Sequence, residues 1–576
     1  MSTRILILSV ISILLACGPI LAGEEQLSPQ AILAQQPRTS YIWPVKDTVE
    51  VTSVLCDNRR GHPHGGIDIS LFGKVGVTPI VSVDDGVLMR IRDSNYGYGR
   101  ALYIRMPGKM VAVYAHLDSF SPRLQKVADE LRKKTGLKKL DYYYEEDDMD
   151  VVIRAGELIA YGGTTGTSVP HLHFEVRYDD LENLNPLTNG FPIDDKIAPV
   201  ATAALFTPID PQSRVNGGTN PSLVRIRNGA AQGVTTVSGR VGLALAAYDQ
   251  NRIGGRRYAP YAMKVFVDGK EYFETRYERW GYIEQDIYYL QYDFDAKKNR
   301  YMRLYNSMPV DIPFYSKADA GTLQDLEPGR HEVRISVADA FGNADDAVMQ
   351  IEVAPCKDKE YRHWPIGDGA YEFFNNKTVS VAEGAFALIG ELYSLFEPVR
   401  VDITAIDSGV PEAVGKCYAV SDPGVTKRRM FTAAFKKPVE EPGKQYGVYL
   451  KNRNGMNFLG NGFNQHDGRI EGRGRSFGMF CLCLDDQPPS ISQPHKKGNT
   501  SPTFSYVVRD NLAGLNAESV IASVDGKRAL TDFNYRTGHA ESEIYWDQAP
   551  GDYELEIRAV DNTGNEVVRK VPFTVK

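Results

Sequence analysis

The sequence predicts an all-β protein of several domains, in which the N-terminal domain is an antiparallel β structure interrupted by one helical insertion. The chain has 576 residues, which is too many for a single hydrophobic core. Short β-branched and aromatic runs separated by Gly and Asp turns recur along it, as is typical of antiparallel sheets. A turn-and-strand pattern over residues 328–343 also returns over residues 550–565, which indicates repeated β modules.

The first 22 residues have the features of a secretory signal peptide. A single basic residue, Arg4, precedes an apolar run that ends near small residues. We expect cleavage near Ala22, followed by a linker over residues 23–40. The alternative is that Leu14-Leu15-Ala16-Cys17, which loosely resembles a lipoprotein signal, makes Cys17 a lipid-anchored N-terminus. The apolar run is too short for a lasting membrane span, and no later stretch is apolar enough, so we expect an exported mature chain without a transmembrane segment.

Charge and cysteine content exclude two classes of protein. The formal net charge of −7 is spread along the chain and gives no support to nucleic-acid binding. Six cysteines are few for a disulfide scaffold of this length. We expect one or two structural bridges among those in the second half, and we interpret Cys56 as a free or buried thiol. The second-half cysteines are Cys356, Cys417, Cys481 and Cys483.

Residues 41–192 form the predicted N-terminal domain, with an insertion over residues 118–152. Ser121-Pro122 is a typical helix start, apolar residues then repeat at helical spacing, and Gly136 predicts the helix end. An acidic, tyrosine-rich tract follows before the β pattern resumes. We interpret the insertion as one wall of a binding groove, with a solvated hairpin or lid as the alternative.

Two short segments of this domain carry side chains that bind metals. In the run Pro-His-Leu-His-Phe-Glu-Val over residues 170–176, strand alternation places His171 and His173 on one face. His64 and Asp68 are likewise an even number of residues apart in an extended, Gly-containing segment. Two histidines and one aspartate leave an open coordination position, which is typical of catalytic zinc sites. His116, between the two segments, is a candidate acid or base.

These motifs resemble the lysostaphin/LytM-type zinc peptidases, family M23, from about Trp43 to Phe191. The resemblance rests on His64 to Asp68, Tyr114 to Leu117, and Gly163 to Glu175, with one departure: only Val169 separates Ser168 from Pro170, one residue fewer than in the family pattern. It implies that a single Zn²⁺ is held by three ligands while two further histidines are catalytic. The implied ligands are His64, Asp68 and His173, and the implied catalytic residues are His116 and His171.

The resemblance also implies a function. We expect an exported zinc-dependent endopeptidase that hydrolyses the peptide cross-links of bacterial peptidoglycan, in the periplasm or at the outer membrane or cell surface. Relatives that have lost metal ligands only activate other wall hydrolases, so a non-hydrolytic regulator is one alternative. A zinc peptidase acting on exported proteins is the other. The full set of ligands and auxiliary histidines argues against a pure regulator.

The rest of the chain is predicted to form three β modules. Residues 198–355 and 486–576 share the repeat and resemble bacterial immunoglobulin-like sandwiches, whereas residues 356–485 lack it and form a β module of uncertain type. We expect these modules to be spacers or docking surfaces for a protein or glycan partner. Their Asp and Asn clusters are interpreted as turn formers, with calcium binding as the alternative.

Overall fold

The structure is a computed structural model of the chain. It describes residues 28–46, 49–59, 62–94, 96–191, 193–210, 212–281, 290–295, 297, 299–307, 311–317, 320–356, 371–373, 379–390, 399–407, 409–421, 430–438, 445–452, 455–499 and 501–576. The expected signal peptide and Cys17 therefore lie outside the described residues. Within the described part, no helix is both long and apolar enough to cross a bilayer.

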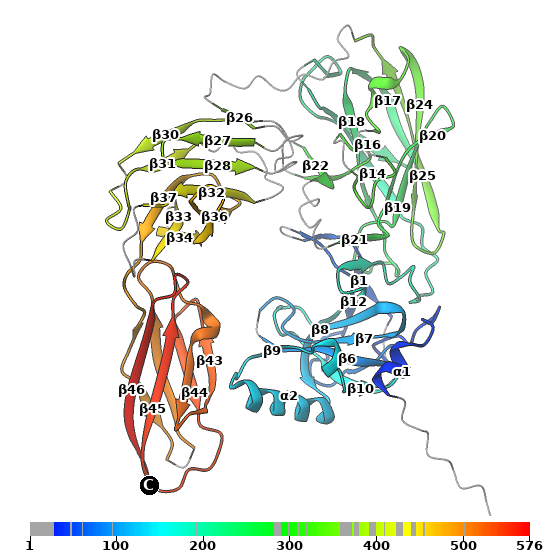
Figure 1. Cartoon of the computed structure of the whole chain (residues 1–576). Helices are drawn as coiled ribbons and strands as arrows, with labels where there is room; N and C mark the ends of the chain where they lie inside the picture. Colours follow the sequence, from blue (N-terminus) through cyan, green and yellow to red (C-terminus); the bar gives the residue numbers. More distant parts are fainter. Residues whose placement is uncertain are drawn as a thin grey trace, which may run out of the picture.

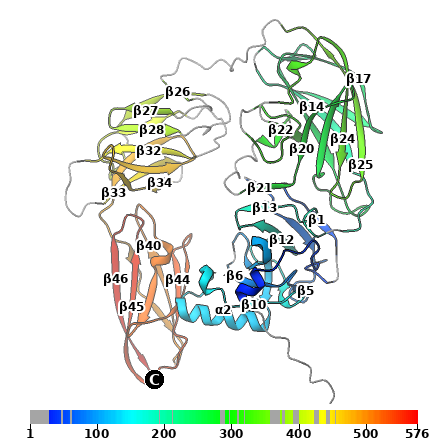
Figure 2. The same cartoon turned by 45° about the vertical axis from the view of Figure 1, so that its right-hand side comes forward.

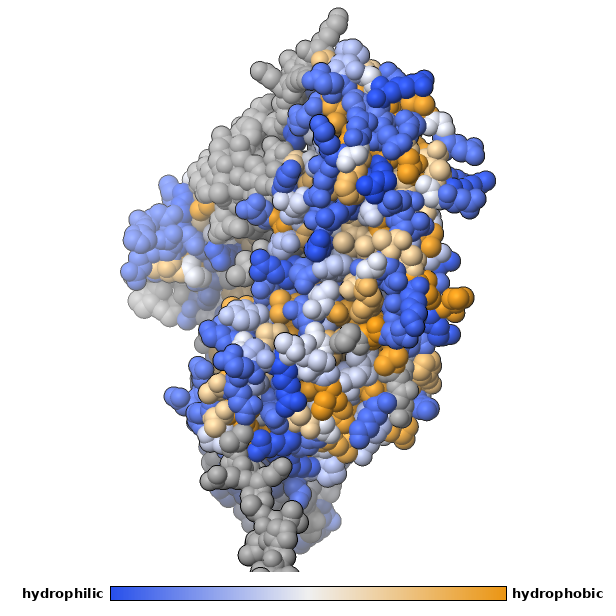
Figure 3. Space-filling view, turned by 90° about the vertical axis from the view of Figure 1, so that its right-hand side faces the viewer, coloured by the Kyte–Doolittle hydropathy of each residue, from blue (hydrophilic) through white to orange (hydrophobic). Residues whose placement is uncertain are grey.

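The predicted all-β, multidomain class is confirmed. Figure 1 shows strand-rich bodies that follow one another along the chain, and the last of them returns to lie beside the helix α2 (Pro122–Thr135) of the first. Figure 2 shows the same neighbourhood after rotation. On the face in Figure 3, hydrophobic residues form small groups among hydrophilic ones. We refer to residues 41–192 as the N-terminal domain, and to 198–355, 356–485 and 486–576 as the first, middle and last modules.

The N-terminal domain is built on a twelve-stranded sheet with the central order β1-β4-β12-β8-β7-β6-β10. Because β4, β12 and β8 are neighbours, the segments that carry the candidate ligands lie side by side. A short hairpin of β2 (Asn58–Arg59) and β3 (His62–Pro63) precedes β4. The strands are β1 (Val51–Ser53), β4 (Ile67–Ser70), β5 (Pro79–Val81), β6 (Gly86–Asp93), β7 (Arg100–Arg105), β8 (Met110–Phe120), β9 (Leu140–Tyr143), β10 (Val152–Ile153), β11 (Leu158–Gly162), β12 (His171–Tyr178), β13 (Glu182–Leu184) and β21 (Arg279–Gly281).

The helix of the insertion begins and ends where the sequence predicts. The Ser121 hydroxyl accepts a hydrogen bond from the Leu124 amide, Pro122 stands in the first turn, and Gly136 ends the helix at φ 72°. Leu124, Ala128 and Leu131 bury the apolar face. The other helical segments are short: α1 (Pro29–Leu33), η1 (Pro107–Lys109), η2 (Glu146–Asp148), η4 (Leu323–Asp325) and η5 (Ala517–Ser519).

The segment after this helix contacts the last module. Two backbone hydrogen bonds join Thr531 of the last module to the segment after the helix. The Thr531 amide donates to the Gly136 carbonyl oxygen, and the Thr531 carbonyl oxygen accepts from the Lys138 amide. Lys139 Nζ lies 2.6 Å from Asp532 Oδ1. The insertion is thus neither a free hairpin nor a free lid, because it anchors the far end of the chain.

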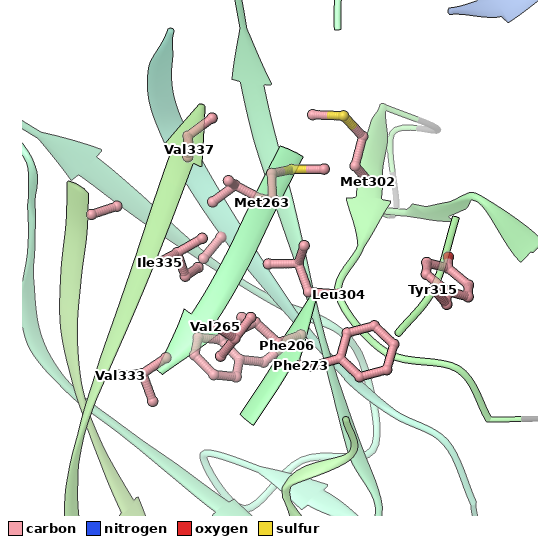
Figure 4. Close-up of a cluster of buried hydrophobic side chains, with 14 of the residues drawn as sticks. Phe206, Met263, Val265, Phe273, Met302, Leu304, Tyr315, Val333, Ile335 and Val337 are labelled. Carbon is pink, nitrogen blue, oxygen red and sulfur yellow. The ribbon is translucent and has the colours of Figure 1, made fainter. Parts of the chain in front are cut away.

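The first module is an eleven-stranded assembly wrapped around a large hydrophobic core. Phe206, Val265 and Ile335 are among the side chains that converge in Figure 4. One strand from this region, β21, leaves the module and pairs with β13 of the N-terminal domain. The strands are β14 (Val200–Pro208), β15 (Arg214–Val215), β16 (Ser222–Arg227), β17 (Ala230–Ser238), β18 (Val241–Tyr248), β19 (Ala262–Val267), β20 (Lys270–Arg276), β22 (Tyr292–Phe294), β23 (Arg300–Arg303), β24 (Gly329–Ala338) and β25 (Ala344–Val353).

The middle module contains two five-stranded sheets and a two-stranded one. A disulfide joins Cys417 to Cys481, so one of the expected bridges is present. Cys56, in the N-terminal domain, is a buried thiol, as expected. The strands are β26 (Tyr371–Phe373), β27 (Val379–Glu383), β28 (Phe386–Gly390), β29 (Val399–Val401), β30 (Ile403–Ile406), β31 (Cys417–Val420), β32 (Phe431–Lys436), β33 (Tyr446–Asn452), β34 (Gly455–Gly460), β35 (Gly462–Asn464), β36 (Arg469–Gly474) and β37 (Met479–Leu484).

The last module has one five-stranded and one four-stranded sheet that enclose their own core. Its long hairpin pairs β45 with β46, as the first module pairs β24 with β25. The sequence repeat therefore corresponds to a repeated hairpin. The strands are β38 (Ser490–Ile491), β39 (His495–Lys497), β40 (Thr503–Arg509), β41 (Ile521–Val524), β42 (Lys527–Arg528), β43 (Leu530–Asn534), β44 (His539–Glu543), β45 (Gly551–Val560) and β46 (Glu566–Val575).

Candidate metal centre

Three donor atoms from distant parts of the N-terminal domain meet at one point. His64 Nε2 lies 3.0 Å from Asp68 Oδ1 and 2.9 Å from His173 Nδ1, and His173 Nδ1 lies 3.0 Å from Asp68 Oδ1. All three residues are buried, with 2%, 5% and 7% of their surfaces exposed in chain order. The structure therefore brings together the three residues that the sequence predicts as metal ligands.

Strand register explains how these atoms meet. His173 is directly opposite Asp68 in the antiparallel pair of β12 and β4. His64 precedes β4, and the two glycines after it let this segment approach β12 closely: a Cβ on Gly65 would lie 2.4 Å from Glu175 Oε1, and one on Gly66 2.1 Å from the Phe174 carbonyl oxygen. The shortened turn before Pro170 leaves this register intact.

The arrangement fits a tetrahedral zinc ion. Zinc takes nitrogen and oxygen ligands at ~2.0–2.1 Å, which places neighbouring donor atoms ~3.3 Å apart. The observed separations of 2.9–3.0 Å are close to this value. Two imidazoles and one carboxylate also leave one position for water or substrate, which distinguishes catalytic from structural zinc sites.

The second ring nitrogen of each histidine in the candidate ligand set has a fixed partner. His64 Nδ1 lies 2.8 Å from the Val54 carbonyl oxygen, and because a carbonyl only accepts, this nitrogen carries the proton and leaves Nε2 for a metal. His173 Nε2 lies 2.7 Å from Glu175 Oε1, which leaves Nδ1 for the metal. Arg59 donates to the other oxygen of Asp68 and so orients that carboxylate.

Glu175 is the centre of a buried charged network. Tyr98 donates to its Oε1 at 2.6 Å, and Arg177 Nε donates to its Oε2 at 2.6 Å. Burial opposes ionisation, but Arg177 and then His173 hold the pKa of Glu175 well below its ordinary value. Burial also opposes charge on His173, yet Asp68 and Glu175 raise its pKa to about 9. The centre thus favours positive charge, and a metal ion bound there takes the place of the proton on His173.

We expect Glu175→Gln to weaken zinc binding by about 10–100-fold, because the amide cannot hold His173 as strongly or neutralise Arg177. Competition with a chromophoric chelator measures this affinity. Glu182→Gln is the matched control, since Glu182 forms a partly exposed ion pair with Arg279 near the same sheet. Equal zinc affinity in the Glu175 variant and the wild type would contradict the orienting role.

Two further histidines lie beside the three candidate ligands. His116, on β8, has its ring centroid 4.7 Å from that of His171 and 5.8 Å from that of His173. His116 Nδ1 lies 2.8 Å from the Thr165 carbonyl oxygen, and His171 Nδ1 lies 2.8 Å from the Val169 carbonyl oxygen. Both Nδ1 atoms therefore carry a proton, while His171 Nε2 lies 3.5 Å from Asp68 Oδ1. Burial and then the neighbouring histidines lower the pKa of His116 to about 3; the pKa of His171 is also lowered, chiefly by burial.

A cleft of about 350 Å³ opens over this cluster. Its described lining comes from the β2–β3 region, the Tyr98 loop, β8 and the segment before β12, and it includes His62 but no residue of 118–152. A larger groove of about 640 Å³ shares Asp68 and His171 with the cleft and continues to residues 245–248 and 256–259. The expectation that the insertion forms a groove wall is wrong for the described residues, because the first module occupies that place.

The first module also supports the metal centre from behind. Trp280 Nε1 donates to the His64 carbonyl oxygen at 3.1 Å, and Gln291 Nε2 donates to the Cys56 carbonyl oxygen at 2.7 Å. Sequence reasoning missed these supporting residues, because nothing near Trp280 in the sequence links it to a histidine more than 200 positions earlier.

Comparisons with known proteins find similarity over part of the chain. No family model matches the chain. The DD-carboxypeptidase/endopeptidase Mpg of Neisseria meningitidis serogroup B is 29% identical over 130 residues, covering 22% of this chain and 23% of Mpg. The murein hydrolase activator NlpD of Escherichia coli K12 is 28% identical over 151 residues, covering 26% of this chain and 31% of NlpD. Part of this chain is similar to part of each of these two proteins.

The similarity to these two curated proteins covers about a quarter of this chain. The matched stretches span less than a third of each curated relative. Among solved structures, the catalytic domain of the M23 protein EnpA from Enterococcus faecalis is 18% identical and covers 25% of this chain and 87% of that one, with a TM-score of 0.15. The SpoIIQ-SpoIIIAH pore-forming complex gives 16% identity, coverage of 26% and 90%, and a TM-score of 0.20. At such scores the structural likeness adds nothing to the argument.

Proposed function

We propose that the chain is an exported zinc-dependent endopeptidase that hydrolyses peptide cross-links of bacterial peptidoglycan, in the periplasm or at the outer membrane or cell surface. The observation that carries this proposal is the convergence of His64 Nε2, Asp68 Oδ1 and His173 Nδ1 beside two further imidazoles. The curated relatives support the substrate class, since Mpg is named an endopeptidase and NlpD a murein hydrolase activator.

The residues divide the chemistry between them. His64, Asp68 and His173 hold zinc, which when bound polarises the scissile carbonyl and lowers the pKa of water. His116 and His171 handle the protons at their Nε2 atoms: a neutral ring accepts the proton of the attacking water, and the other ring stabilises the charge that develops on the carbonyl oxygen when its Nε2 carries a proton to donate. The backbone carbonyls of Thr165 and Val169 hold the two rings in the required tautomer.

The groove between the N-terminal domain and the first module is the proposed substrate path. Its wall in the first module carries Arg256, Arg257 and Arg300. Guanidinium groups bind carboxylates well, and peptide stems of peptidoglycan carry free carboxylates. The first module would then bind and position the substrate, in addition to acting as a spacer between domains.

A second candidate, a regulator without hydrolytic activity, is favoured by the likeness to NlpD. Such a protein needs neither a metal ion nor catalytic histidines. The buried donor triangle and its fixed tautomers support hydrolysis instead, because binding a partner would not require these residues to converge.

Mass spectrometry of cross-linked muropeptides tests the proposal. We expect the protein to convert dimers to monomers, to lose this activity with a chelator, and to regain it when zinc is restored. Unchanged dimers in the presence of zinc-loaded protein would contradict wall endopeptidase activity. Stimulation of a second wall hydrolase by the zinc-free protein would instead establish the regulator.

A further inference from the structure

Two groups of three aspartates lie outside the histidine cluster, one at the start of each immunoglobulin-like module. In each group, one carboxylate oxygen from every residue lies within 4.8 Å of the others. Three carboxylates at this distance repel one another unless something positive lies among them. The first aspartate group is Asp195, Asp249 and Asp339, and the second aspartate group is Asp485, Asp510 and Asp561.

The first aspartate group ties a linker to the first module. Asp195 belongs to the segment that enters the module before β14, Asp249 directly follows β18, and Asp339 directly follows β24. Asn343 Nδ2 donates to the Asp195 carbonyl oxygen at 3.0 Å and to Asp339 Oδ2 at 2.6 Å. The group therefore ties the linker that follows the N-terminal domain to the first module.

The second aspartate group repeats this arrangement between the middle and last modules. Asp485 directly follows β37 and precedes β38, Asp510 directly follows β40, and Asp561 directly follows β45. Asn565 Nδ2 donates to the Asp485 carbonyl oxygen at 2.9 Å and to Asp561 Oδ2 at 2.8 Å, as Asn343 does in the first group. The same three positions and the same asparagine bridge thus occur twice in one chain.

Turn formation explains only part of these contacts. Asp339 Oδ1 accepts from the amides of Phe341 and Asn343, which is the turn role expected from the sequence. Other oxygens are buried without a hydrogen-bond partner: Asp195 Oδ2, Asp485 Oδ1 and Asp510 Oδ1. Asp195 and Asp485 are only 7% and 1% exposed, so water cannot readily solvate these oxygens.

A basic side chain does not balance either group. Within the described part of the chain, none of the ion pairs reaches any of the six aspartates, and Lys196 pairs with Asp194 rather than with Asp195. Burial and then the neighbouring aspartates raise the pKa of both Asp249 and Asp485. Buried, unpaired and mutually repelling carboxylates are the environment that a cation stabilises.

We propose that each aspartate group binds one calcium ion and thereby fixes the angle of a domain junction. The donors are all carboxylate oxygens, which suit hard cations rather than zinc, and their irregular arrangement suits the flexible coordination of calcium better than the strict octahedron of magnesium. One ion fixes the linker that leaves the N-terminal domain onto the first module, and the other fixes the end of the middle module onto the last module. Together they hold the chain in the closed path that brings the last module onto α2.

Calorimetric titration of the full chain with CaCl₂, after metal removal on a chelating resin and reloading with one equivalent of zinc, tests the proposal independently of hydrolytic activity. We expect two equivalents of calcium for the wild type, one for Asp195→Asn, one for Asp485→Asn and none for the double variant. Asparagine keeps an oxygen to accept the Ile197 amide but removes the charge. Asp345→Asn, at an exposed position on β25, is the matched control and should bind two.

Thermal unfolding provides the second readout. Calcium should raise the Tm of the wild type and of Asp345→Asn and leave that of the double variant unchanged, because only the native aspartate groups bind it. Absence of both calcium heat and a Tm shift in the wild type at millimolar CaCl₂ would overturn the proposal. So would calcium binding that survives in the folded double variant, or binding of MgCl₂ in place of CaCl₂.

Discussion

Replacing either His64 or Asp68 by alanine is expected to abolish zinc binding and hydrolysis together. Each residue supplies one of the three donor atoms that lie 2.9–3.0 Å apart, and two remaining donors cannot hold the ion tightly. A metal contributes several kcal/mol to the stabilisation of such a transition state, so cleavage of muropeptides should fall by about a thousandfold or more. Metal analysis of the purified variants and the muropeptide assay measure the two losses.

The control for these variants is His331→Ala. His331 is a histidine of the first module that pairs with Asp268, far along the chain from the centre. This variant should retain both zinc and activity. Circular dichroism establishes whether the His64 and Asp68 variants fold, since alanine at Asp68 leaves Arg59 without that carboxylate. Stoichiometric zinc in folded protein of both variants would exclude these residues as ligands.

Local signals in the sequence were enough to predict the fold class and the helix of the insertion. Helix α2 begins at a Ser-Pro pair and ends at a glycine with positive φ, and both signals act through neighbouring backbone groups. The docking of the insertion on the last module was not predictable in this way. It depends on Thr531 and Asp532, which lie almost 400 residues after the insertion. No feature of the sequence around them indicates that contact.

The grouping of the candidate ligands was predictable only within each segment. Strand alternation predicted which side chains share a face, and the Gly-Gly pair after His64 predicted an extended segment, but neither showed that β4 and β12 are neighbours. The residues that support this grouping from elsewhere in the fold were not predictable. Trp280 reaches His64 only because β21 leaves the first module and joins β13. Such support depends on tertiary pairing, which spacing along the chain does not reveal.

The wall of the groove could not be predicted from nearness in sequence. The insertion follows the strand that carries His116, and this nearness in sequence made it the expected wall. Strand β8 continues past His116 to Phe120, however, so that the chain leaves the metal centre before the helix begins. The first module, distant in sequence, folds back over the same edge and supplies residues 245–248 and 256–259.

His116→Ala is expected to retain zinc but to lower the turnover number by about 10²–10⁴-fold, the usual contribution of a positioned acid or base. His116 contacts none of the donor atoms directly, yet its ring lies beside that of His171 and its Nδ1 is fixed by the Thr165 carbonyl. Single-turnover cleavage of muropeptides by zinc-loaded protein measures the loss.

A second substitution separates proton transfer from backbone strain. His116 has φ 60°, a left-handed conformation that asparagine adopts more readily than alanine. If the imidazole acts on protons, His116→Asn should be as inactive as His116→Ala, and added imidazole should restore part of the activity of the alanine variant. Activity close to wild type in the asparagine variant would show that His116 only maintains the backbone, and zinc lost from both variants would show that it supports the metal. The proposed role therefore requires three results together: bound zinc, lost turnover in both variants, and partial rescue by a free base that occupies the space left by the ring.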